Sequence, residues 1–533
     1  MARKNNNGIK ITTQAALDRA VWSICDILRR DKAKGARLYV PELTWMLFLA
    51  ALDQKEAEEE ARARALGTSF TPSIEPPYRW RDWAAPPNGN HPAGSEPAGG
   101  WKRRELTEAP LGAFLHFVND DLFPYLRDLG CRPGATTRQR VISMIFANKE
   151  RTILESETNL LDAIDRVDAL SRAEISEQHI FLLSQAFEGL LPRLGEKAND
   201  GGQFFTPREI IRIIVRTANP QLGGTVYDPC CGTGGFLIEA YKHMMAQNPA
   251  PTQIEQLKTE TFWGREYANE AIPICLANMV LHDIDLPRIW HGNTLTGVAT
   301  DGSLFEGAPL QFDYILTNPP FGSKEGKDAQ AQFAFKTGKA QVLFLQHIID
   351  ALAPGGTCGM VIDEGVMFHT KTAAFQQTKR KLLDECDLWC VISLPPNVFV
   401  NAGAGAKTNL LFFTKGRPTR RIWYYDLSDV KVTKKQPLTL AHFDDFFGRL
   451  ALPPDDPGRI GERSWYEDIE TIRRKKYDLK AFNPNAPDNS DRRTPEELIA
   501  VIRQAQQEID KALQALAQSE IAAPPPEIQE KER

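Results

Sequence analysis

The feature that most constrains the fold is a glycine-rich turn between a short strand pattern and a helical pattern. Residues 225–236 read TVYDPCCGTGGF, and a helical pattern follows. The glycines permit a tight turn and a close approach of the backbone to a ligand, and a helix start presents free N–H groups. The turn lacks the Lys-Ser/Thr pair of a P-loop and the spacing of GxGxxG. Its Asp228 suits a cationic ligand, such as the ammonium and sulfonium groups of S-adenosylmethionine.

A second motif, Asn318-Pro319-Pro320-Phe321, directly follows the apolar strand pattern of residues 312–317. A strand end places this loop at the carboxyl edge of a sheet, where open α/β folds bind ligands. The Asn318 side-chain oxygen can accept one N–H of an amino group, the stiff prolines expose a backbone carbonyl for the other, and Phe321 offers a stacking face. The motif predicts a clamp for a planar amine, with an ordinary proline turn as the alternative.

A third strand pattern ends in an acid about one βα unit after the glycine turn. Residues 261–266 read TFWGRE, and Glu266 follows Phe236 by 30 residues (266 − 236). In doubly wound folds, a carboxylate at the end of the second strand accepts hydrogen bonds from ribose hydroxyls. An isolated Glu is usually a solvated loop acid, but these neighbours favour a ribose contact.

Strand and helix patterns alternate through the middle of the chain, as a doubly wound sheet requires. We expect strands at residues 225–228, 261–266, 288–291, 312–317, 357–362, 388–394, 409–414 and 421–426. A helix over 342–352 ends at Pro354-Gly355-Gly356, which is a stop signal before a strand. The predicted fold class is therefore α/β, with a Rossmann-like doubly wound sheet.

Together with residues 202–209 (GQFFTPRE), these segments resemble the N6-adenine DNA methyltransferases, and specifically the modification subunit of type I restriction systems. The resemblance covers FFTPRE, DPCCGTGGF, the Glu266 strand and NPPF, in the order that this subgroup uses. It extends to LPPNVF and AKTNLLFF in residues 394–413, and to AVWSICDILR near the start and KYDL near the end. Two departures are Cys230-Cys231, which replaces smaller or polar residues, and Asn293, which stands where relatives often have an Asp.

The resemblance implies a methyltransferase domain that uses S-adenosyl-L-methionine. The cofactor-binding residues that it implies are Gln203, Phe204, Phe205, Thr206, Pro207, Arg208, Asp228, Cys230, Gly232, Thr233, Gly234, Gly235, Glu266 and Asn293. Among these, Thr206 and nearby backbone would hold the methionine end, and Asn293 the adenine ring. The implied catalytic residues are Asn318, Pro319, Pro320 and Phe321, which act on a base flipped out of the duplex. Phe399 and Lys407 would border the base pocket.

The implied activity is methyl transfer from S-adenosylmethionine to the N6 amino group of adenine in DNA, within a type I restriction-modification complex. The implied partners are double-stranded DNA, a specificity subunit that chooses the sequence, a second modification subunit, and a restriction subunit that is a translocase and nuclease. The alternatives are a standalone adenine methyltransferase, an RNA guanine-N2 or protein-glutamine methyltransferase, and a non-catalytic scaffold that senses the cofactor. The intact Asn318 argues against the scaffold.

Composition agrees with this class of protein. A content of 42% hydrophobic and 25% charged residues is typical of soluble globular proteins. No run approaches the roughly 18 apolar residues of a membrane span, and the polar start lacks a signal peptide's apolar core, so we expect a cytoplasmic protein. Eight cysteines without a C-x-x-C pair predict reduced thiols rather than a zinc site or a disulfide framework, so we expect no bound metal. A net charge of −5 argues against a chain that grips long DNA unaided, although a local basic groove is compatible with it.

We expect three regions along the chain. Residues 1–170 form a helical domain, interrupted by a Pro- and Gly-rich loop near residues 67–103. Residues 171–440 form the methyltransferase domain, and residues 441–533 form a C-terminal region.

The C-terminal region ends in a predicted helix over residues 494–519. Thr494 and Glu497 form a capping box at its start, and apolar residues then recur at spacings of three and four. Such a seam requires a partner helix, either within the chain or, as the resemblance implies, in the specificity subunit. Residues 522–533 are predicted to be disordered.

Overall fold

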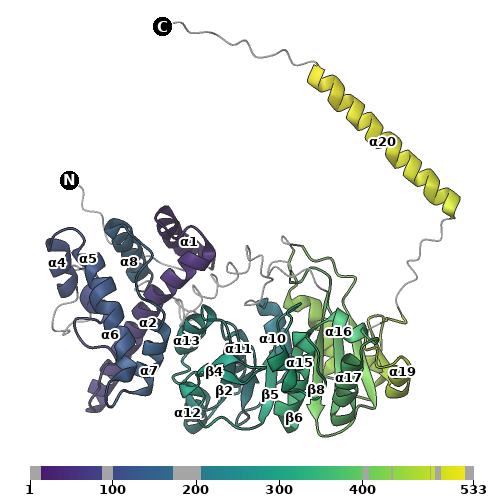
Figure 1. Cartoon of the computed structure of the whole chain (residues 1–533), viewed down its shortest axis with the longest axis horizontal. Helices are drawn as coiled ribbons and strands as arrows, with labels where there is room; N and C mark the ends of the chain where they lie inside the picture. Colours follow the sequence, from purple (N-terminus) through teal and green to yellow (C-terminus); the bar gives the residue numbers. More distant parts are fainter. Residues whose placement is uncertain are drawn as a thin grey trace. The chain divides into compact units, whose positions relative to one another are not determined.

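The structure is a computed structural model that describes residues 14–86, 100–171, 206–399, 407–433, 436–480, 482–485 and 494–521. The chain divides into two compact units, Met1–Asn483 and Pro484–Arg533. The first unit contains a group of N-terminal helices and one large sheet with its flanking helices (Figure 1). Within the described residues, no helix is long and apolar enough to cross a membrane.

Helices fill the N-terminal part of the first unit. They are α1 (Gln14–Arg30), α2 (Ala36–Leu66), α3 (Trp80–Trp83), α4 (Trp101–Glu108), α5 (Ala113–His116), the π-helix η1 (Phe117–Leu122), α6 (Phe123–Asp128), the 3₁₀-helix η2 (Leu129–Cys131), α7 (Thr137–Phe146) and α8 (Glu157–Ser171). Their core is aromatic. The Trp45 ring centroid lies 6.5 Å from that of Trp83 and 5.2 Å from that of Phe123, and all three side chains are buried.

The region predicted as a loop at residues 67–103 contributes to this core. Trp80 and Trp83 of α3 are 3% and 0% exposed, and α4 begins at Trp101. The prediction of an unstructured loop is wrong here because a four-residue helix is too short to show an apolar period. Its tryptophans anchor the segment, while residues 87–99 lie outside the described part of the chain.

The described strands form one sheet, in the order β10-β9-β7-β8-β6-β5-β1-β2-β3-β4. The strands are β1 (Val226–Asp228), β2 (Phe262–Glu266), β3 (Arg288–Asn293), β4 (Val298–Asp301), β5 (Phe312–Thr317), β6 (Leu352–Asp363), β7 (Cys386–Ser393), β8 (Thr408–Lys415), β9 (Arg421–Asp426) and β10 (Ser464–Asp468). The central run β3-β2-β1-β5-β6 is parallel, and β8 is antiparallel to both of its neighbours. This arrangement confirms the predicted doubly wound α/β fold.

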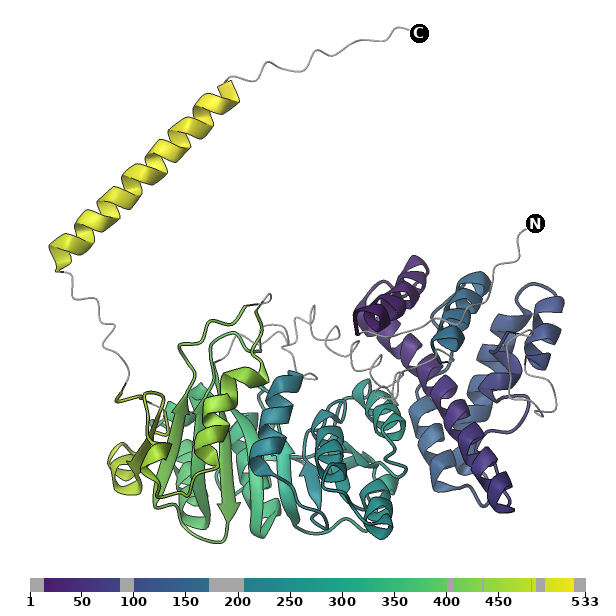
Figure 2. The ribbon, with the colours of Figure 1, turned by 180° about the vertical axis from the view of Figure 1, so that it is seen from behind.

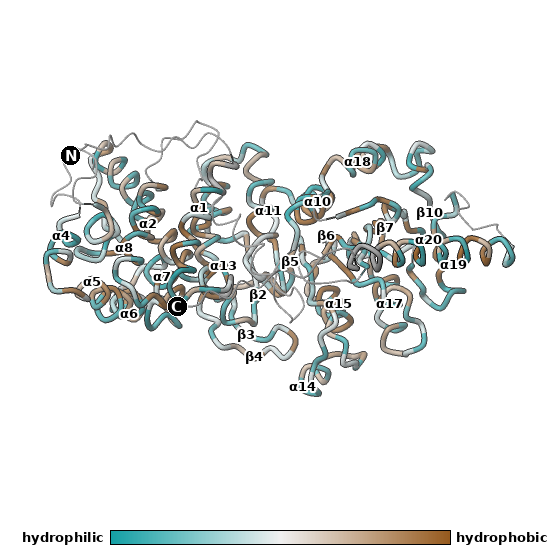
Figure 3. The backbone as a smooth tube through the Cα atoms, turned by 90° about the horizontal axis from the view of Figure 1, so that it is seen from above, coloured by the Kyte–Doolittle hydropathy of each residue, from teal (hydrophilic) through white to brown (hydrophobic). Residues whose placement is uncertain are grey.

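Helices cover both faces of the sheet, so the central strands are continuously apolar. One layer contains α10 (Arg208–Ala218), α11 (Gly235–Met245) and α18 (Asp444–Leu450), and the other contains α15 (Ala340–Ala351) and α17 (Ala373–Glu385), as Figure 3 shows. Figure 2 shows α10 in front of the strands on the first face. The remaining helices of this part are α12 (Pro251–Thr259), α13 (Ala271–Leu281), α14 (Lys327–Ala331), α16 (Glu364–Phe368), α19 (Ile469–Arg474) and the 3₁₀-helices η3 (Ser303–Phe305), η5 (Leu440–Phe443) and η6 (Pro457–Arg459).

Two edge strands were not predicted. β4 pairs with the end of β3, and β10 pairs with β9. Both strands are short, with four and five residues, and therefore give little periodic signal. Because β10 belongs to the same sheet, the sheet continues beyond residue 440, where the predicted methyltransferase domain ends.

Charged side chains join the N-terminal helices to the sheet domain. The Lys55 ammonium on α2 lies 2.7 Å from Asp283 and 2.9 Å from Asp285, which follow α13. Arg138 on α7 binds Glu59 and lies 3.4 Å from the same Asp285. These ion pairs are partly buried, so they fix which faces of the two parts meet.

The second unit contains α20 (Pro495–Ile521). Its predicted capping box is present, because the Thr494 N–H donates to the Glu497 carboxylate at 2.7 Å and the Glu497 N–H donates to the Thr494 hydroxyl at 3.2 Å. Ile502, Ile509 and Leu513 of the apolar seam are 53–66% exposed. The predicted disorder of residues 522–533 lies outside the described residues.

Candidate active site

The two sequence motifs meet at the point where the strand order reverses. β1 pairs with β5, the chain leaves β1 toward β2 on one side, and β5 continues to β6 on the other. Such a switch point is where open α/β sheets bind ligands at their carboxyl edge. Asp228 ends β1 and accepts a hydrogen bond of 2.6 Å from the Thr317 hydroxyl, which ends β5. This contact ties the glycine turn to the Asn318 loop.

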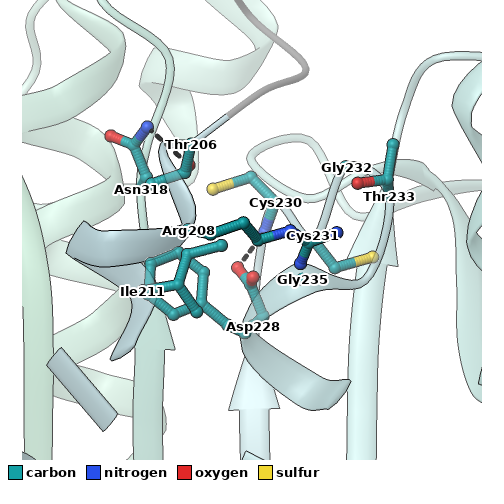
Figure 4. A pocket seen from close by; sticks show the side chains of 11 residues that line it. Thr206, Arg208, Ile211, Asp228, Cys230, Cys231, Gly232, Thr233, Gly235 and Asn318 are labelled. Carbon is teal, nitrogen blue, oxygen red and sulfur yellow. Dashed lines mark hydrogen bonds between the residues drawn. The ribbon is translucent and has the colours of Figure 1, made fainter. Parts of the chain in front are cut away.

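A pocket opens above this contact (Figure 4). It is lined by Thr206, Arg208, Ile211, Asp228, Cys230, Cys231, Gly232, Thr233, Gly235, Phe236 and Asn318. Glycine is required at two places in the turn. Gly234 has a φ of +81°, in the left-handed region that favours glycine. A Cβ at Gly235 would come within 2.8 Å of Ile211 and 2.9 Å of the Arg208 guanidinium, so a side chain would close the pocket.

Asp228 is the acidic group at the base of the pocket. Burial raises the pKa of this carboxyl to about 7, and the nearby charge of Glu266 adds to the rise. The Thr317 hydroxyl and the Cys230 N–H oppose the shift by hydrogen bonding to the carboxylate. A buried carboxylate without an ion-pair partner is stabilised when a cationic ligand binds beside it.

Cys230 is the thiol that lies beside Asp228 in the pocket. Its sulfur lies 3.1 Å from the Thr317 hydroxyl oxygen. Burial raises the pKa of the Cys230 thiol well above its ordinary value, so the thiol stays protonated at neutral pH. Because the thiolate is the nucleophilic form, Cys230 lines the pocket without serving as a nucleophile.

Glu266 stands at the end of β2 and shapes the glycine turn. One carboxylate oxygen accepts the Gly232 N–H at 2.8 Å, and the other accepts the N–H groups of Tyr267 and Ala268 at 2.9 and 2.8 Å. Burial raises the pKa of Glu266, although these three donors favour its charged form. The side chain is thus a fixed acceptor beside the turn, and its predicted ribose contact stays a prediction.

Among the described residues, two polar groups of the pocket are buried without a hydrogen-bond partner. They are the Asn318 amide oxygen and the Arg208 guanidinium, whose Nε and Nη2 are both unpaired. Leaving a buried acceptor or a charged donor unpaired costs free energy, so such groups indicate where a ligand with complementary groups would bind. The Arg208 guanidinium requires an anionic group and Asp228 a cationic one. A ligand with both a carboxylate and positive charge, such as S-adenosylmethionine, fits these residues.

The Asn318 side chain is held in one orientation. Its amide nitrogen donates to the Thr206 hydroxyl at 3.0 Å, which leaves the amide oxygen as the free acceptor (Figure 4). The next carbonyl is also held, because the Gln341 amide nitrogen on α15 donates to the Pro319 oxygen at 3.1 Å. The Gln341 oxygen in turn accepts the Asp363 N–H at 3.0 Å, at the end of β6. A carbonyl has two lone pairs, so Pro319 keeps one for a ligand.

Aromatic rings stand beside this pair of acceptors. The Phe321 and Phe399 rings meet edge to face, with centroids 5.4 Å apart. Phe399 is 1% exposed and follows β7. The Lys407 ammonium lies 3.1 Å from the Glu364 carboxylate, at the end of β6. The structure therefore packs Phe399 against Phe321 and places Lys407 in an ion pair, and their predicted place at the base pocket stays a prediction.

Comparison with known proteins places the chain in a family. A model of the N-6 DNA methylases matches residues 178–492, and a model of the HsdM N-terminal domain matches residues 17–167. The chain belongs to the N-6 DNA methylase family. The two matches follow one another along the chain, so together they cover the helical N-terminal part as well as the sheet.

The methylase resembles type I modification subunits over nearly its whole length. The type I restriction enzyme EcoEI methylase subunit of Escherichia coli is 31% identical over 508 residues, which are 93% of this chain and 95% of that protein. A solved modification subunit of a putative type I restriction enzyme from Vibrio vulnificus YJ016 is 30% identical, with a TM-score of 0.72 over 90% of this chain and 98% of that one. A chain from a structural study of assembly and conformational transition in a type I R-M system is 34% identical, with a TM-score of 0.71 over 96% and 100%.

Some predicted residues lie away from the pocket. Asn293 ends β3, and its amide oxygen accepts the N–H groups of Leu295 and Thr296 at 2.9 and 3.3 Å. That oxygen is therefore engaged in a local turn, and the amide nitrogen is the group that can face an adenine ring. Pro207 is the residue before α10 and does not line the pocket. The predicted Gln203, Phe204 and Phe205 lie outside the described residues.

Five residues of the methylase site were not predicted as site residues, namely Thr317, Gln341 and the pocket-lining Ile211, Cys231 and Phe236. Thr317 could have been found, since a hydroxyl stands in the last position of an apolar strand directly before the Asn318 motif. Gln341 gives a weaker signal, which is one amide at the start of an apolar helical run. Ile211 gives no signal, because an apolar residue that lines a pocket has the same pattern as one that lies in the core.

The first prediction concerns the pH dependence of cofactor affinity. Asp228 must lose its proton to stabilise a cation, so S-adenosylmethionine should bind more weakly as the pH falls through about 7. Asp228→Asn should bind weakly at every pH between 6 and 8. Titration calorimetry measures both affinities, and exposed Asp429→Asn controls for the loss of one charge. An unchanged pH dependence in Asp228→Asn would show that another group binds the cation.

The same substitution should stabilise the protein without ligand. The pKa of Asp228 is about 7 in the folded chain and roughly 4 when unfolded, so only the folded form keeps the proton between those values. The free energy of unfolding therefore falls as the pH rises from about 4 to 7. Asp228→Asn should then raise it at pH 8, by up to about 4 kcal/mol, and have little effect at pH 4. Urea unfolding at the two pH values measures the difference.

Gln341 gives a third prediction. Gln341→Glu keeps the acceptor for the Asp363 N–H but loses the donor to the Pro319 carbonyl. The carbonyl is then free to turn, so kcat should fall on the order of tenfold, while the KM for cofactor stays unchanged. Gln341→Met removes both contacts and should also lower the melting temperature. If kcat followed only the loss of stability in the two variants, Gln341 would have no role in positioning the carbonyl.

Proposed function

We propose that this chain transfers a methyl group from S-adenosylmethionine to the N6 amino group of adenine in DNA, as the modification subunit of a type I restriction-modification complex. The observation that carries the proposal is the buried Asn318 amide oxygen. This oxygen has no hydrogen-bond partner among the described residues, and it borders the pocket that contains Asp228. The amide nitrogen of the same side chain donates to the Thr206 hydroxyl, which fixes the direction of the oxygen. An acceptor kept free at this position is matched to an N–H donor, and the adenine amino group offers two.

The cofactor is assigned to the pocket between α10 and the glycine turn. Asp228 lies opposite its positive charge and Arg208 binds its carboxylate, since each lacks an ion-pair partner among the described residues. Glu266 accepts from the ribose hydroxyls through lone pairs that its three backbone donors leave free. When bound, the cofactor supplies a methyl group on a sulfonium, which the adenine nitrogen takes up with loss of one of its protons.

The chain's own contribution is to activate and orient the amine. The lone pair of an adenine amino group is delocalised into the ring. Asn318 accepts one N–H and the Pro319 carbonyl accepts the other, which favours a pyramidal nitrogen with an available lone pair. Phe321 provides a face for the base, which must leave the duplex to reach the pocket. Because Phe399 packs against Phe321 in this structure, we infer that it moves aside or stacks on the base.

The partners follow from the same proposal. A specificity subunit reads the DNA sequence and binds α20, a second copy of this chain completes the modification complex, and a restriction subunit joins it, all in the cytoplasm. The exposed apolar seam of α20 supports a helical partner. RNA and protein substrates are less consistent with the chain, since the HsdM N-terminal match extends over residues 17–167.

Replacing Asn318 by Ala tests the activity. Asn318→Ala should lower methyl transfer to unmodified genomic DNA by about a thousandfold or more, because the amine loses an acceptor made in the transition state. The Kd for cofactor should change little. Transfer of labelled methyl groups and calorimetry measure the two effects.

Thr217→Val is the matched control for that experiment. It removes another buried oxygen that lacks a partner, on α10 outside the pocket. This variant should keep full activity. Transfer by Asn318→Ala at a rate near that of the unsubstituted chain would refute the clamp.

Removing α20 tests the assignment of the partner. Deletion of residues 494–533 should abolish stable association with a specificity subunit, since it removes the exposed apolar seam. A shorter deletion of residues 522–533 keeps the helix and should leave association unchanged. Co-purification and sedimentation measure both, and a stable complex without residues 494–533 would refute the assignment.

A further inference from the structure

The connection between β5 and α15 has no role in the site described so far. It comprises residues 322–339 and carries Lys324, Lys327, Lys336 and Lys339, all of which are exposed. It also contains two acids, Glu325 and Asp328, so its net charge is +2 (4 − 2) in a chain whose net charge is −5. Within the described part of the chain, none of the four lysines forms an ion pair with an acid.

This β5–α15 connection is held in place at both ends and in its middle. Lys324 and Lys339 form an antiparallel backbone bridge, and the Ala340 N–H donates to the Ser323 carbonyl at 3.2 Å. The Gln346 side chain accepts the Phe335 N–H and donates to the Phe335 carbonyl, each at 3.0 Å. The lysines are therefore carried on a fixed frame.

Apolar packing fixes the same frame against α15. Ala329 of α14 is 1% exposed and belongs to one cluster with Leu343 and Phe344, against which Phe333 packs. Figure 3 shows α14 next to α15, at the outer edge of that helix layer. Such an anchored element loses little conformational entropy when it binds a partner.

The connection starts and ends at the amine clamp. It begins directly after Phe321, and Gln341, two residues after Lys339, donates to the Pro319 carbonyl. A base that reaches Asn318 stays attached to its strand, so the neighbouring phosphates must run past the mouth of the pocket. A strand carries one negative charge per roughly 3.4 Å of helix axis, which brings several phosphates near the clamp.

We propose that the β5–α15 connection binds the sugar–phosphate backbone next to the target adenine through its four exposed lysines. The inference rests on the proposed function, since it takes DNA as the substrate. Lysines act as point charges that contact phosphates and carry no sequence information. The connection thus positions the strand whose base enters the pocket, independently of the sequence that a partner reads.

The test compares two variants of equal charge change in the full-length chain, assembled as the complex that methylates DNA. Lys327→Gln with Lys336→Gln removes two charges from the connection. Arg417→Gln with Arg420→Gln removes two exposed charges from the opposite edge of the sheet, before β9. Binding of a duplex of arbitrary sequence is measured between 50 and 300 mM salt, together with the KM for genomic DNA and the Kd for cofactor.

The lysine variant should bind DNA on the order of tenfold more weakly at 0.1 M salt, and the slope of log K against log salt should fall by about 1 to 2. Its KM for DNA should rise equally, with cofactor binding unchanged, and the arginine variant should match the unsubstituted chain. An unchanged slope, or an equal change in both variants, would overturn the inference. Loss of complex assembly without a change of slope would also overturn it, since the lysines would then bind a protein partner. Failure of the proposed function is distinguishable, because then neither variant nor the unsubstituted chain would transfer methyl groups.

Discussion

The hydrogen bond between Asp228 and Thr317 is the contact on which the site depends. It joins the ends of β1 and β5, which lie 89 residues apart in sequence and adjacent in the sheet. Because strand order reverses here, the turn after β1 and the loop after β5 diverge and leave a pocket between them. A 2.6 Å contact inside the core leaves little freedom in the distance between the acid of one motif and the amide of the other. The pairing of β1 with β5 thus fixes the distance between the glycine turn, which is proposed to bind the cofactor, and the Asn318 loop, which is proposed to bind the base.

The same site stores unfavourable interactions. Asp228 has a raised pKa, and the Arg208 guanidinium and the Asn318 oxygen have unpaired atoms among the described residues; each of these features costs free energy. A fold selected only for stability would pair or replace these groups, so their retention indicates that a ligand relieves the cost when it binds. Groups already oriented for a ligand need no rearrangement during the reaction, which is the physical basis of electrostatic catalysis. Gln341 and Thr206 contribute by preventing the acceptors from turning away.

The sequence predicted the parts of the site that depend on local chemistry. Glycine at positions 234 and 235, the acid at the end of β1 and the Asn318 motif each follow from a strand end and a turn, so their positions could be found without a structure. Thr317 and Gln341 depend on which strands and helices become neighbours, and no local pattern contains that information. Asn293 was found from its position in the sequence, but its role could not be. Its amide oxygen accepts a hydrogen bond from the following turn, and a sequence motif does not show that contact. Likewise, α3 depends on where Trp80 and Trp83 pack rather than on any period.

Two separate surfaces of this chain are proposed to serve two roles: exposed lysines bind the DNA strand beside the clamp, and the apolar seam of α20 binds a partner. A methylase with a net charge of −5 gains little from general attraction to DNA, so its affinity must come from local charge or from a partner. The lysines of the β5–α15 connection supply local charge beside the clamp, where it positions one strand. The exposed seam of α20 is an apolar surface in a separate unit, and its proposed role is to bind a helix of the specificity subunit. If Lys and Arg were spread over the whole surface, the chain would hold any duplex strongly, and a partner could add little discrimination. Under the proposed function, the isolated chain binds DNA weakly although its Asn318 and Pro319 acceptors are already in place. Methyl transfer therefore depends on assembly with a partner that binds DNA.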